Sequence, residues 1–225
     1  MKLLLFFLLL STGLFSQKKY SFDYLIEYDF QENENSKVKK RYILSNSKDN
    51  TYDLLVWQSS AKNINIFFCV DLEGIRIRKT IPARDLFSNE KLFIDCSDYI
   101  VGRISSIYND KKYRFTVRRD SVLLTDTLQH YQMDIISKKL KKQYKFGTSH
   151  YLVEKETQFH LPLMRFSEKF DARITSKNIP NGIAKEMYTI NDFRHTKEYH
   201  YKLVNYVKIE KEIIISNPCE QQNNK

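Results

Sequence analysis

The sequence predicts a mainly β protein: a single antiparallel sheet curled into an incomplete barrel, or a β-sandwich, with one or two short helices. Apolar and polar residues alternate with a period of two over several long segments, as in strands with one buried face. The 15 Tyr and 15 Phe residues accompany many Ile, Val and Thr residues, which favour strands. No helical pattern alternates with the strands, which argues against a parallel α/β sheet.

The clearest strand pattern lies near the N-terminus. From Tyr20 to Phe30 every second residue is apolar or aromatic, and only Leu25 breaks the alternation. A period of two places this aromatic set on one face of a long strand and the acidic residues on the other. If that face lines an open barrel it can hold an acyl chain, and if two sheets close on each other it is core. The residues expected to contact such a ligand are Tyr20, Phe22, Tyr24, Ile26 and Tyr28.

The next elements continue the alternation and are separated by polar turns. Strands are expected over 38–46 and 52–59, on either side of the turn-forming residues 47–50. Residues 64–72 and 75–81 form a predicted hairpin around Gly74, and Pro82 ends it because proline cannot continue the hydrogen-bond ladder. Residues 83–89 then suit one short helical turn.

The second half of the chain shows the same pattern less regularly. Strands are expected over 92–96, 99–108 and 113–118, and a tight turn at Asp120-Ser121 leads into one strand over 122–136. A basic connector over 138–145 precedes a strand over 145–159, and apolar residues between 160 and 181 indicate a short helix. A turn at Ile179-Pro180-Asn181-Gly182 precedes the last two strands, over 184–190 and 199–215.

The first sixteen residues have the layout of a secretory signal peptide. Lys2 precedes an apolar run from Leu3 to Leu10, and mostly small residues follow it up to Ser16. The run is shorter than the roughly 20 residues that span a bilayer. No cysteine lies near the expected cut, so a lipid anchor on a mature N-terminal Cys is not expected. We therefore expect export to the periplasm or the cell exterior, with a signal peptide over 1–16, one β domain over 17–216 and a polar flexible tail over 217–225.

The formal net charge of +10 has two readings. It indicates an acidic partner, such as an anionic envelope surface, or it reflects an AT-rich genome, because Lys, Asn, Ile, Tyr and Phe have AT-rich codons. Two basic clusters are either solvated faces or, if they lie side by side, one patch for anionic head groups: Lys111, Lys112, Arg114, Arg118 and Arg119, and Lys138, Lys139, Lys141, Lys142 and Lys145. Export and the lack of a reader motif argue against a nucleic-acid partner.

The three cysteines are Cys69, Cys96 and Cys219. An exported protein meets an oxidising compartment, where one disulfide can form and one thiol is left over. Cys69 and Cys96 both lie in strand-like segments and are the candidate pair, while Cys219 is the alternative partner for either. Three scattered cysteines form neither a disulfide scaffold nor a zinc knuckle.

No catalytic motif is present: the sequence contains no nucleophile elbow, no zinc-protease motif, no Cys-x-x-Cys and no phosphate loop. Neither a strand nor a helix brings His195 and His200 together on one metal. We therefore expect no catalytic residue, no cofactor and no metal site; two or more histidines meeting a carboxylate in one cleft would point to an enzyme instead. The five histidines are each expected at a surface or a strand edge: His130, His150, His160, His195 and His200.

The layout of the chain resembles the small periplasmic carriers of outer-membrane lipoproteins and lipids. The resemblance rests on the opening strand Tyr20–Phe30, the closing stretch Tyr199–Ile215 and the turn Pro180-Asn181-Gly182. It covers most of the mature chain in layout and involves no specific motif. It implies an incomplete antiparallel β-barrel whose apolar inner face is covered by short helices, and it implies no catalytic residue.

Two non-catalytic functions follow as hypotheses. The first is an exported binding protein for a lipid-like or other apolar ligand, with a lipid or a lipoprotein as its partner. The alternative is a structural or interaction module of a bacterial envelope complex, whose protein partners the sequence does not identify. The alternative predicts a filled core with an exposed apolar patch or an open sheet edge. An enzyme with site residues from distant strands is the third hypothesis.

Overall fold

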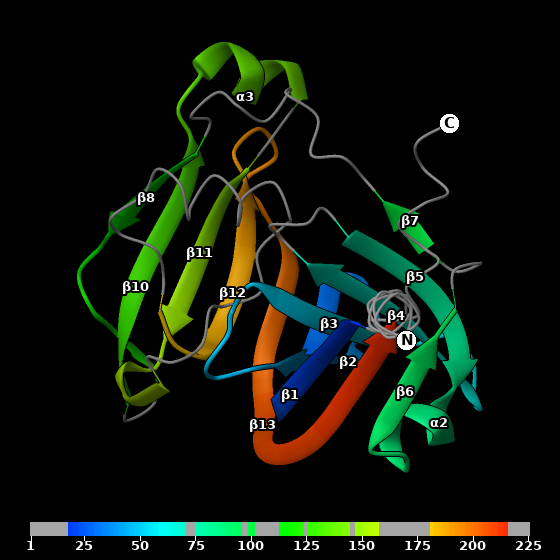
Figure 1. Ribbon diagram of the computed structural model, residues 1–225. Coiled ribbons are helices and arrows are strands. Elements are labelled where there is room, and N and C mark those ends of the chain that lie inside the picture. Colours follow the sequence, from blue (N-terminus) through cyan, green and yellow to red (C-terminus); the bar gives the residue numbers. More distant parts are fainter. Residues whose placement is uncertain are drawn as a thin grey trace, which may run out of the picture.

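The structure is a computed structural model, and it describes residues 18–70, 75–95, 99–101, 113–123, 126–144, 147–157 and 181–215. Strands dominate this part of the chain (Figure 1). The helices are α2 (Ala83–Phe87) and α3 (Lys138–Tyr144), and a 3-10 turn, η4, spans Lys155–Thr157. The strands are β1 (Lys18–Asn33), β2 (Lys39–Ser45), β3 (Tyr52–Gln58), β4 (Asn63–Val70), β5 (Ile75–Pro82), β6 (Lys91–Ile94), β7 (Tyr99–Val101), β8 (Tyr113–Val117), β9 (Ser121–Leu123), β10 (Asp126–Ile135), β11 (Thr148–Val153), β12 (Ala184–Asn191) and β13 (Thr196–Ile215).

All of these strands belong to one sheet. Hydrogen-bonded neighbours follow the order β7-β5-β4-β3-β2-β1-β13-β12-β11-β10-β8, while β6 pairs with β13 and β9 pairs with β10. The β6–β13 pair is parallel, and the others are antiparallel. Within the described residues the two ends of this path do not pair. The predicted fold class is confirmed: the described residues form one large, mainly antiparallel sheet that does not close, with two short helices.

Two hydrophobic cores lie on opposite faces of this sheet. Ile43 and Leu44 are neighbours on β2, so their side chains point to opposite faces, and each belongs to a different core. The buried residues of core 1 are Tyr20, Phe22, Leu44, Tyr52, Leu54, Val56, Ile64, Ile66, Ile77, Ile81, Leu86, Leu92, Ile94, Ile213 and Ile215. Those of core 2 are Ile26, Tyr28, Phe30, Ile43, Phe115, Tyr131, Met133, Tyr151, Val153, Ile183, Ala184, Met187 and Tyr201.

The two longest strands, β1 and β13, contribute to both cores. Their pairing register shifts between Phe22 and Tyr24, where two steps along β1 oppose three steps along β13, from Lys208 to Lys211. Such a bulge bends a strand pair and increases its twist, and Figure 1 shows β13 curved through a broad U. Core 1 therefore lies against one half of each strand, and core 2 against the other half.

The prediction that the aromatic set from Tyr20 to Phe30 shares one face is wrong. Phe22 is in core 1, whereas Ile26 is in core 2. Leu25 pairs with Leu44 and packs against core 1, so the apolar alternation changes parity at Leu25. The strand itself is confirmed and is longer than expected, from Lys18 to Asn33. The reason is the bulge, which allows one strand to bury opposite faces along its length.

Most of the remaining elements match their predicted positions. The β4–β5 hairpin, α2 and the strands β2, β3, β6, β8, β12 and β13 are confirmed. Of the strand expected over 145–159, residues 148–153 form β11, whereas Lys155–Thr157 form the 3-10 turn η4. The single strand expected over 122–136 is wrong, because β9 and β10 pair with each other, with Leu123 opposite Asp126. The basic connector forms the helix α3. The helix expected between 160 and 181 lies outside the described residues, as do Cys96, Cys219 and residues 102–108.

The turn before β12 requires glycine. Gly182 has a φ of 135°, a conformation that side-chain-bearing residues rarely adopt. A Cβ atom there would lie 2.5 Å from the carbonyl oxygen of Glu154. The next residue, Ile183, donates its N–H to Thr157 Oγ1 at 2.7 Å and accepts from the Glu154 N–H at 3.0 Å. The close approach at Gly182 thus docks the start of β12 on the end of β11.

Candidate functional site

The five predicted ligand-contact residues are divided between the cores and the surface of β1. Tyr20 and Phe22 pack edge-on against the Tyr52 ring in core 1, with ring centroids 5.1 Å and 5.4 Å away. Ile26 and Tyr28 are buried in core 2, where Tyr28 is only 1% exposed. Tyr24 is half-buried. Four of the five side chains are therefore in contact with the protein's own apolar residues.

Two adjoining grooves open beside the bend of β13. They have volumes of about 430 Å³ and 260 Å³ and share a wall formed by Glu90, Ile209, Glu210 and Lys211. The larger groove is mostly polar and also borders Phe22. The smaller one is lined with apolar side chains from three elements: Leu25, Leu44, Leu86 and Phe87. Both grooves are open to solvent, so neither is an enclosed apolar cavity.

A buried lysine holds the wall of these grooves. Lys211 is 8% exposed, and its ammonium donates to the carbonyl oxygens of Leu86 and Asn89. Burial lowers the pKa of Lys211 below its ordinary value, and the Glu90 carboxylate opposes this shift. The Glu212 N–H also donates to the carbonyl of Glu90 at 2.8 Å. Lys211 therefore ties the segment between α2 and β6 to β13, which is a structural role.

The middle of β13 has an unpaired edge within the described part of the chain. β12 pairs with β13 as far as Lys202, and β6 pairs with it from Glu212 onward. Between these positions β13 pairs only with β1. We call residues 203–210 the open β13 edge, since Lys211 and Glu212 are held by the α2–β6 segment. Two apolar residues on it, Val204 and Val207, are 47% and 43% exposed.

Three of the five histidines lie in a row across β10, β11 and β13. His130 Nε2 lies 3.0 Å from His150 Nδ1, and the His150 ring stacks on Tyr188 with centroids 4.9 Å apart. His200 meets the same tyrosine ring edge-on at 6.0 Å. His195 is exposed in the turn between β12 and β13, and His160 lies outside the described residues. Sequence analysis missed this row because strand pairing, not spacing, aligns it.

The histidine row divides into two electrostatic environments. Desolvation, with smaller contributions from His130 and Arg118, lowers the pKa of His150 to about 4, and the pKa of His130 is also lowered by burial. Both imidazoles are therefore neutral near pH 7. At the other end the hydrogen bond from His200, supported by Lys197, lowers the pKa of Glu186 to about 2. Glu186 is thus a permanent carboxylate, 2.5 Å from His200 and 2.6 Å from Lys197.

The histidine row brings His150 and His200 to the Tyr188 ring and places Glu186 beside His200, but the row does not line either of the two grooves described above. Neither of the two grooves is lined by a histidine. Among the described residues no group of three or more His, Cys, Asp or Glu residues is arranged to hold a metal ion.

No helix in the described ranges has the length and apolar content needed to cross a membrane.

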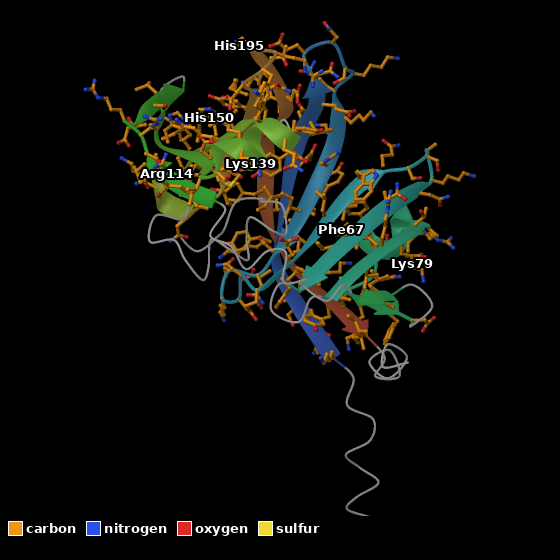
Figure 2. All side chains as sticks on the ribbon, turned by 90° about the horizontal axis from the view of Figure 1, so that it is seen from above. Phe67, Lys79, Arg114, Lys139, His150 and His195 are labelled. Carbon is orange, nitrogen blue, oxygen red and sulfur yellow. The ribbon has the colours of Figure 1, made fainter. Side chains whose placement is uncertain are left out.

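The two basic clusters meet at Asp134. Arg114 lies opposite Asp134 in the β8–β10 pair, and Lys141 of α3 contacts the same carboxylate at 2.7 Å. Figure 2 shows Arg114, Lys139 and His150 in the same part of the molecule, apart from Phe67 and Lys79. Arg114 on β8 and Lys139 on α3 are both exposed, and β10 contacts both of these elements. Lys111, Lys112 and Lys145 lie outside the described residues.

Comparison with known proteins identifies solved structures that are distantly similar to this chain. No family model and no curated protein matches the chain. One similar solved structure is the Pseudomonas aeruginosa MucA/MucB complex, with a TM-score of 0.43 and 7% identity over 83% of this chain and 51% of that chain. A crystal structure of MucB has a TM-score of 0.40 and 6% identity over 83% and 53%. The chain thus spans about half the length of these structures. Similarity this distant carries no conclusion about function, and the resemblance to lipid carriers stays a prediction.

Proposed function

We propose that the protein is a non-catalytic interaction module of the bacterial cell envelope, which binds an extended segment of a partner protein along the open β13 edge. The observation that carries this proposal is the interruption of the sheet between β12 and β6, where residues 203–210 pair only with β1 among the described strands. Export, predicted from residues 1–16, places such a partner in the envelope.

An unpaired strand edge is a ready site for strand addition. It presents a row of backbone N–H and C=O groups, and proteins usually protect such edges with charges, prolines or covering elements. Here Val204 and Val207 are exposed beside the unpaired backbone. A partner strand would supply main-chain hydrogen bonds for affinity and alternate side chains for specificity. Eight residues extend over about 26 Å, enough for a typical strand.

The charges near the open β13 edge favour an acidic partner. Lys202 and Lys208 are exposed, and the chain as a whole carries a net charge of +10. Glu210 is the exposed acid at the far end of the edge. We therefore expect a segment in which apolar residues alternate with Asp or Glu, arranged to meet the two lysines. A partner segment that places Lys or Arg directly opposite these two lysines should bind more weakly.

Binding of an apolar ligand is the weaker candidate function. Four of its five predicted contact residues are buried in the two cores, and only Phe22 borders a described groove. The smaller, apolar groove has a volume of about 260 Å³ and is open to solvent. Ligand pockets for small molecules are usually about 300–1,000 Å³ and enclose most of the ligand. The distribution of apolar surface thus favours the interaction module.

Site-specific photo-crosslinking tests the proposal. Val204 or Val207 is replaced by a photo-reactive phenylalanine in the full chain, produced in its own cells. Both positions are expected to crosslink to the same segment of one partner. Val122 on β9, which is 71% exposed, is the matched control and is expected to give no such product. A synthetic peptide with the crosslinked sequence should then slow amide exchange in residues 203–210 and leave that of β3 unchanged.

Two results would overturn this function. Equal crosslinking at Val122 would show that any exposed apolar residue captures the partner. Peptide binding without protection of residues 203–210 would place the interface elsewhere. Native mass spectrometry without detergent separates the two candidate functions, because the interaction module should give the bare polypeptide mass and a carrier should give an added lipid-sized mass.

A further inference from the structure

The facing ring nitrogens of His130 and His150 are separated by a distance that suits two ligands of one metal ion. We propose that His130 Nε2 and His150 Nδ1 bind a transition-metal ion such as Zn²⁺ or Cu²⁺ at the surface of the β10–β11 pair. The two nitrogens lie 3.0 Å apart and come from adjacent antiparallel strands. This site is separate from the open β13 edge, so it does not depend on the proposed function.

The distance between the two nitrogens suits a shared metal. Zinc lies about 2.0–2.1 Å from an imidazole nitrogen, so two ligands at angles between 90° and 109° stand roughly 2.8–3.4 Å apart. The observed 3.0 Å falls inside this range. Imidazole is a preferred ligand of zinc, copper and nickel, whereas it is a poor ligand for Ca²⁺ or Mg²⁺. The site therefore selects borderline transition metals over hard cations.

The protons can rearrange to free both nitrogens. At 3.0 Å one of the two facing nitrogens carries the hydrogen and the other accepts it. A neutral histidine can instead carry its proton on the other nitrogen, which for His130 is Nδ1, 3.5 Å from Ser121 Oγ. With both protons on the far nitrogens, His130 Nε2 and His150 Nδ1 each present a lone pair to the metal. Binding then needs a change of tautomer and no net loss of a proton.

The surroundings hold the two rings in place. The His150 ring stacks on Tyr188 with an interplanar angle of 14°, and Ser121 Oγ lies 3.5 Å from the far nitrogen of His130, at the limit of a hydrogen bond. Outer-shell partners of this kind fix the tautomer and direction of metal-binding histidines. Both histidines are half-exposed, so water can complete the coordination. With only two protein ligands we expect micromolar rather than nanomolar affinity.

One nearby cation opposes metal binding and supplies a sharp test. The positive charge of Arg118 acts on both imidazoles, and its Nε donates to Gln132 at 2.7 Å. Lys197 and Asp192 act on His150 with opposite signs. Replacing Arg118 removes a positive charge that repels the metal ion, and it leaves both histidine ligands in place. Arg118→Gln should therefore bind the metal more tightly than the wild type.

Calorimetric titration of the untagged mature chain with ZnCl₂, and EPR with CuCl₂, test the site. One ion per chain is expected, with two nitrogen ligands in the copper spectrum. His130→Asn and His150→Asn should each weaken binding at least tenfold, and Arg118→Gln should strengthen it several-fold. His195→Asn is the matched control, because His195 is exposed in a turn, and it should bind like the wild type.

The outcomes separate this site from other metal-binding groups. Unchanged binding in the double variant His130→Asn/His150→Asn would assign the metal to cysteines or to the chain terminus and overturn the proposal. Absence of saturable binding in the wild type would overturn it as well. If an asparagine variant fails to fold, the comparison of Arg118→Gln with the wild type decides, since equal affinity there contradicts the assignment.

Discussion

The hydroxyl of Tyr28 donates a hydrogen bond to the carbonyl oxygen of Ala184 at 3.0 Å, across 156 positions of sequence. Tyr28 lies on β1 and Ala184 begins β12, and β13 runs between these strands in the sheet. Desolvation, with smaller effects from Glu154 and Tyr201, raises the pKa of Tyr28 far above its ordinary range. The phenol therefore stays protonated and keeps its donor at any pH at which the protein folds.

Removing this donor should destabilise the protein. Tyr28→Phe keeps the ring in core 2 but leaves the Ala184 carbonyl without its phenol partner, which should lower the free energy of unfolding by about 1–2 kcal/mol. Urea denaturation measures the change. Tyr42→Phe is the control, since Tyr42 is half-buried and packs edge-on against Phe87 at 5.4 Å; it should change stability by less than about 0.5 kcal/mol. Equal effects of the two substitutions would contradict the role given to Tyr28.

Truncating the aromatic residues of β1 should cost stability in proportion to their burial. Phe22 is 2% exposed in core 1, so Phe22→Ala should lower the free energy of unfolding by about 3–5 kcal/mol. Tyr24 is half-buried, and Tyr24→Ala should cost markedly less. Thermal and urea unfolding of both variants measure the difference. A stable Phe22→Ala variant that loses a co-purifying lipid would instead support the function as an apolar-ligand carrier.

Acid should remove a contribution that Glu186 makes to stability. The pKa of Glu186 is lowered from 4.5 in the unfolded chain to about 2 in the fold, chiefly by the hydrogen bond with His200. A lowered carboxyl pKa stabilises the fold fully above pH 4.5, and the contribution disappears as pH falls towards 2. Unfolding measured at a series of pH values should show that the wild type is more stable than Glu186→Gln by about 2 kcal/mol at pH 7. Each pKa unit corresponds to about 1.4 kcal/mol, and solvent screens part of this electrostatic energy.

The matched variant for this prediction is Lys197→Met, which leaves His200 in place. Lys197 lies 2.6 Å from Glu186 and over the Tyr188 ring at 3.9 Å. Its removal should reduce the pH-dependent part of the stability without abolishing it. A difference between wild type and Glu186→Gln that stays constant from pH 7 to pH 2 would show that the carboxylate charge is not the cause.

Local patterns predicted most of the individual strands, and the exceptions have physical reasons. The alternation from Tyr20 to Phe30 identified β1 correctly, and its break at Leu25 was the one local sign that the strand changes its buried face. Periodicity alone could not interpret that break, because the bulge also depends on the partner strand β13. The β9–β10 hairpin was missed because only two residues separate the short strand β9 from β10, so the two strands resemble one continuous segment.

The sequence by itself determined the strand-rich composition, most strand positions and the short polar turns, because these depend on propensities and alternation within a few neighbouring residues. Tertiary structure alone decided that one sheet carries two cores, that β13 has an open edge between β12 and β6 within the described residues, and that His130 meets His150. Each of these depends on which strands pair and in what register. Pairing is settled by burial and hydrogen bonding summed over segments far apart in the chain, and no local pattern contains that sum.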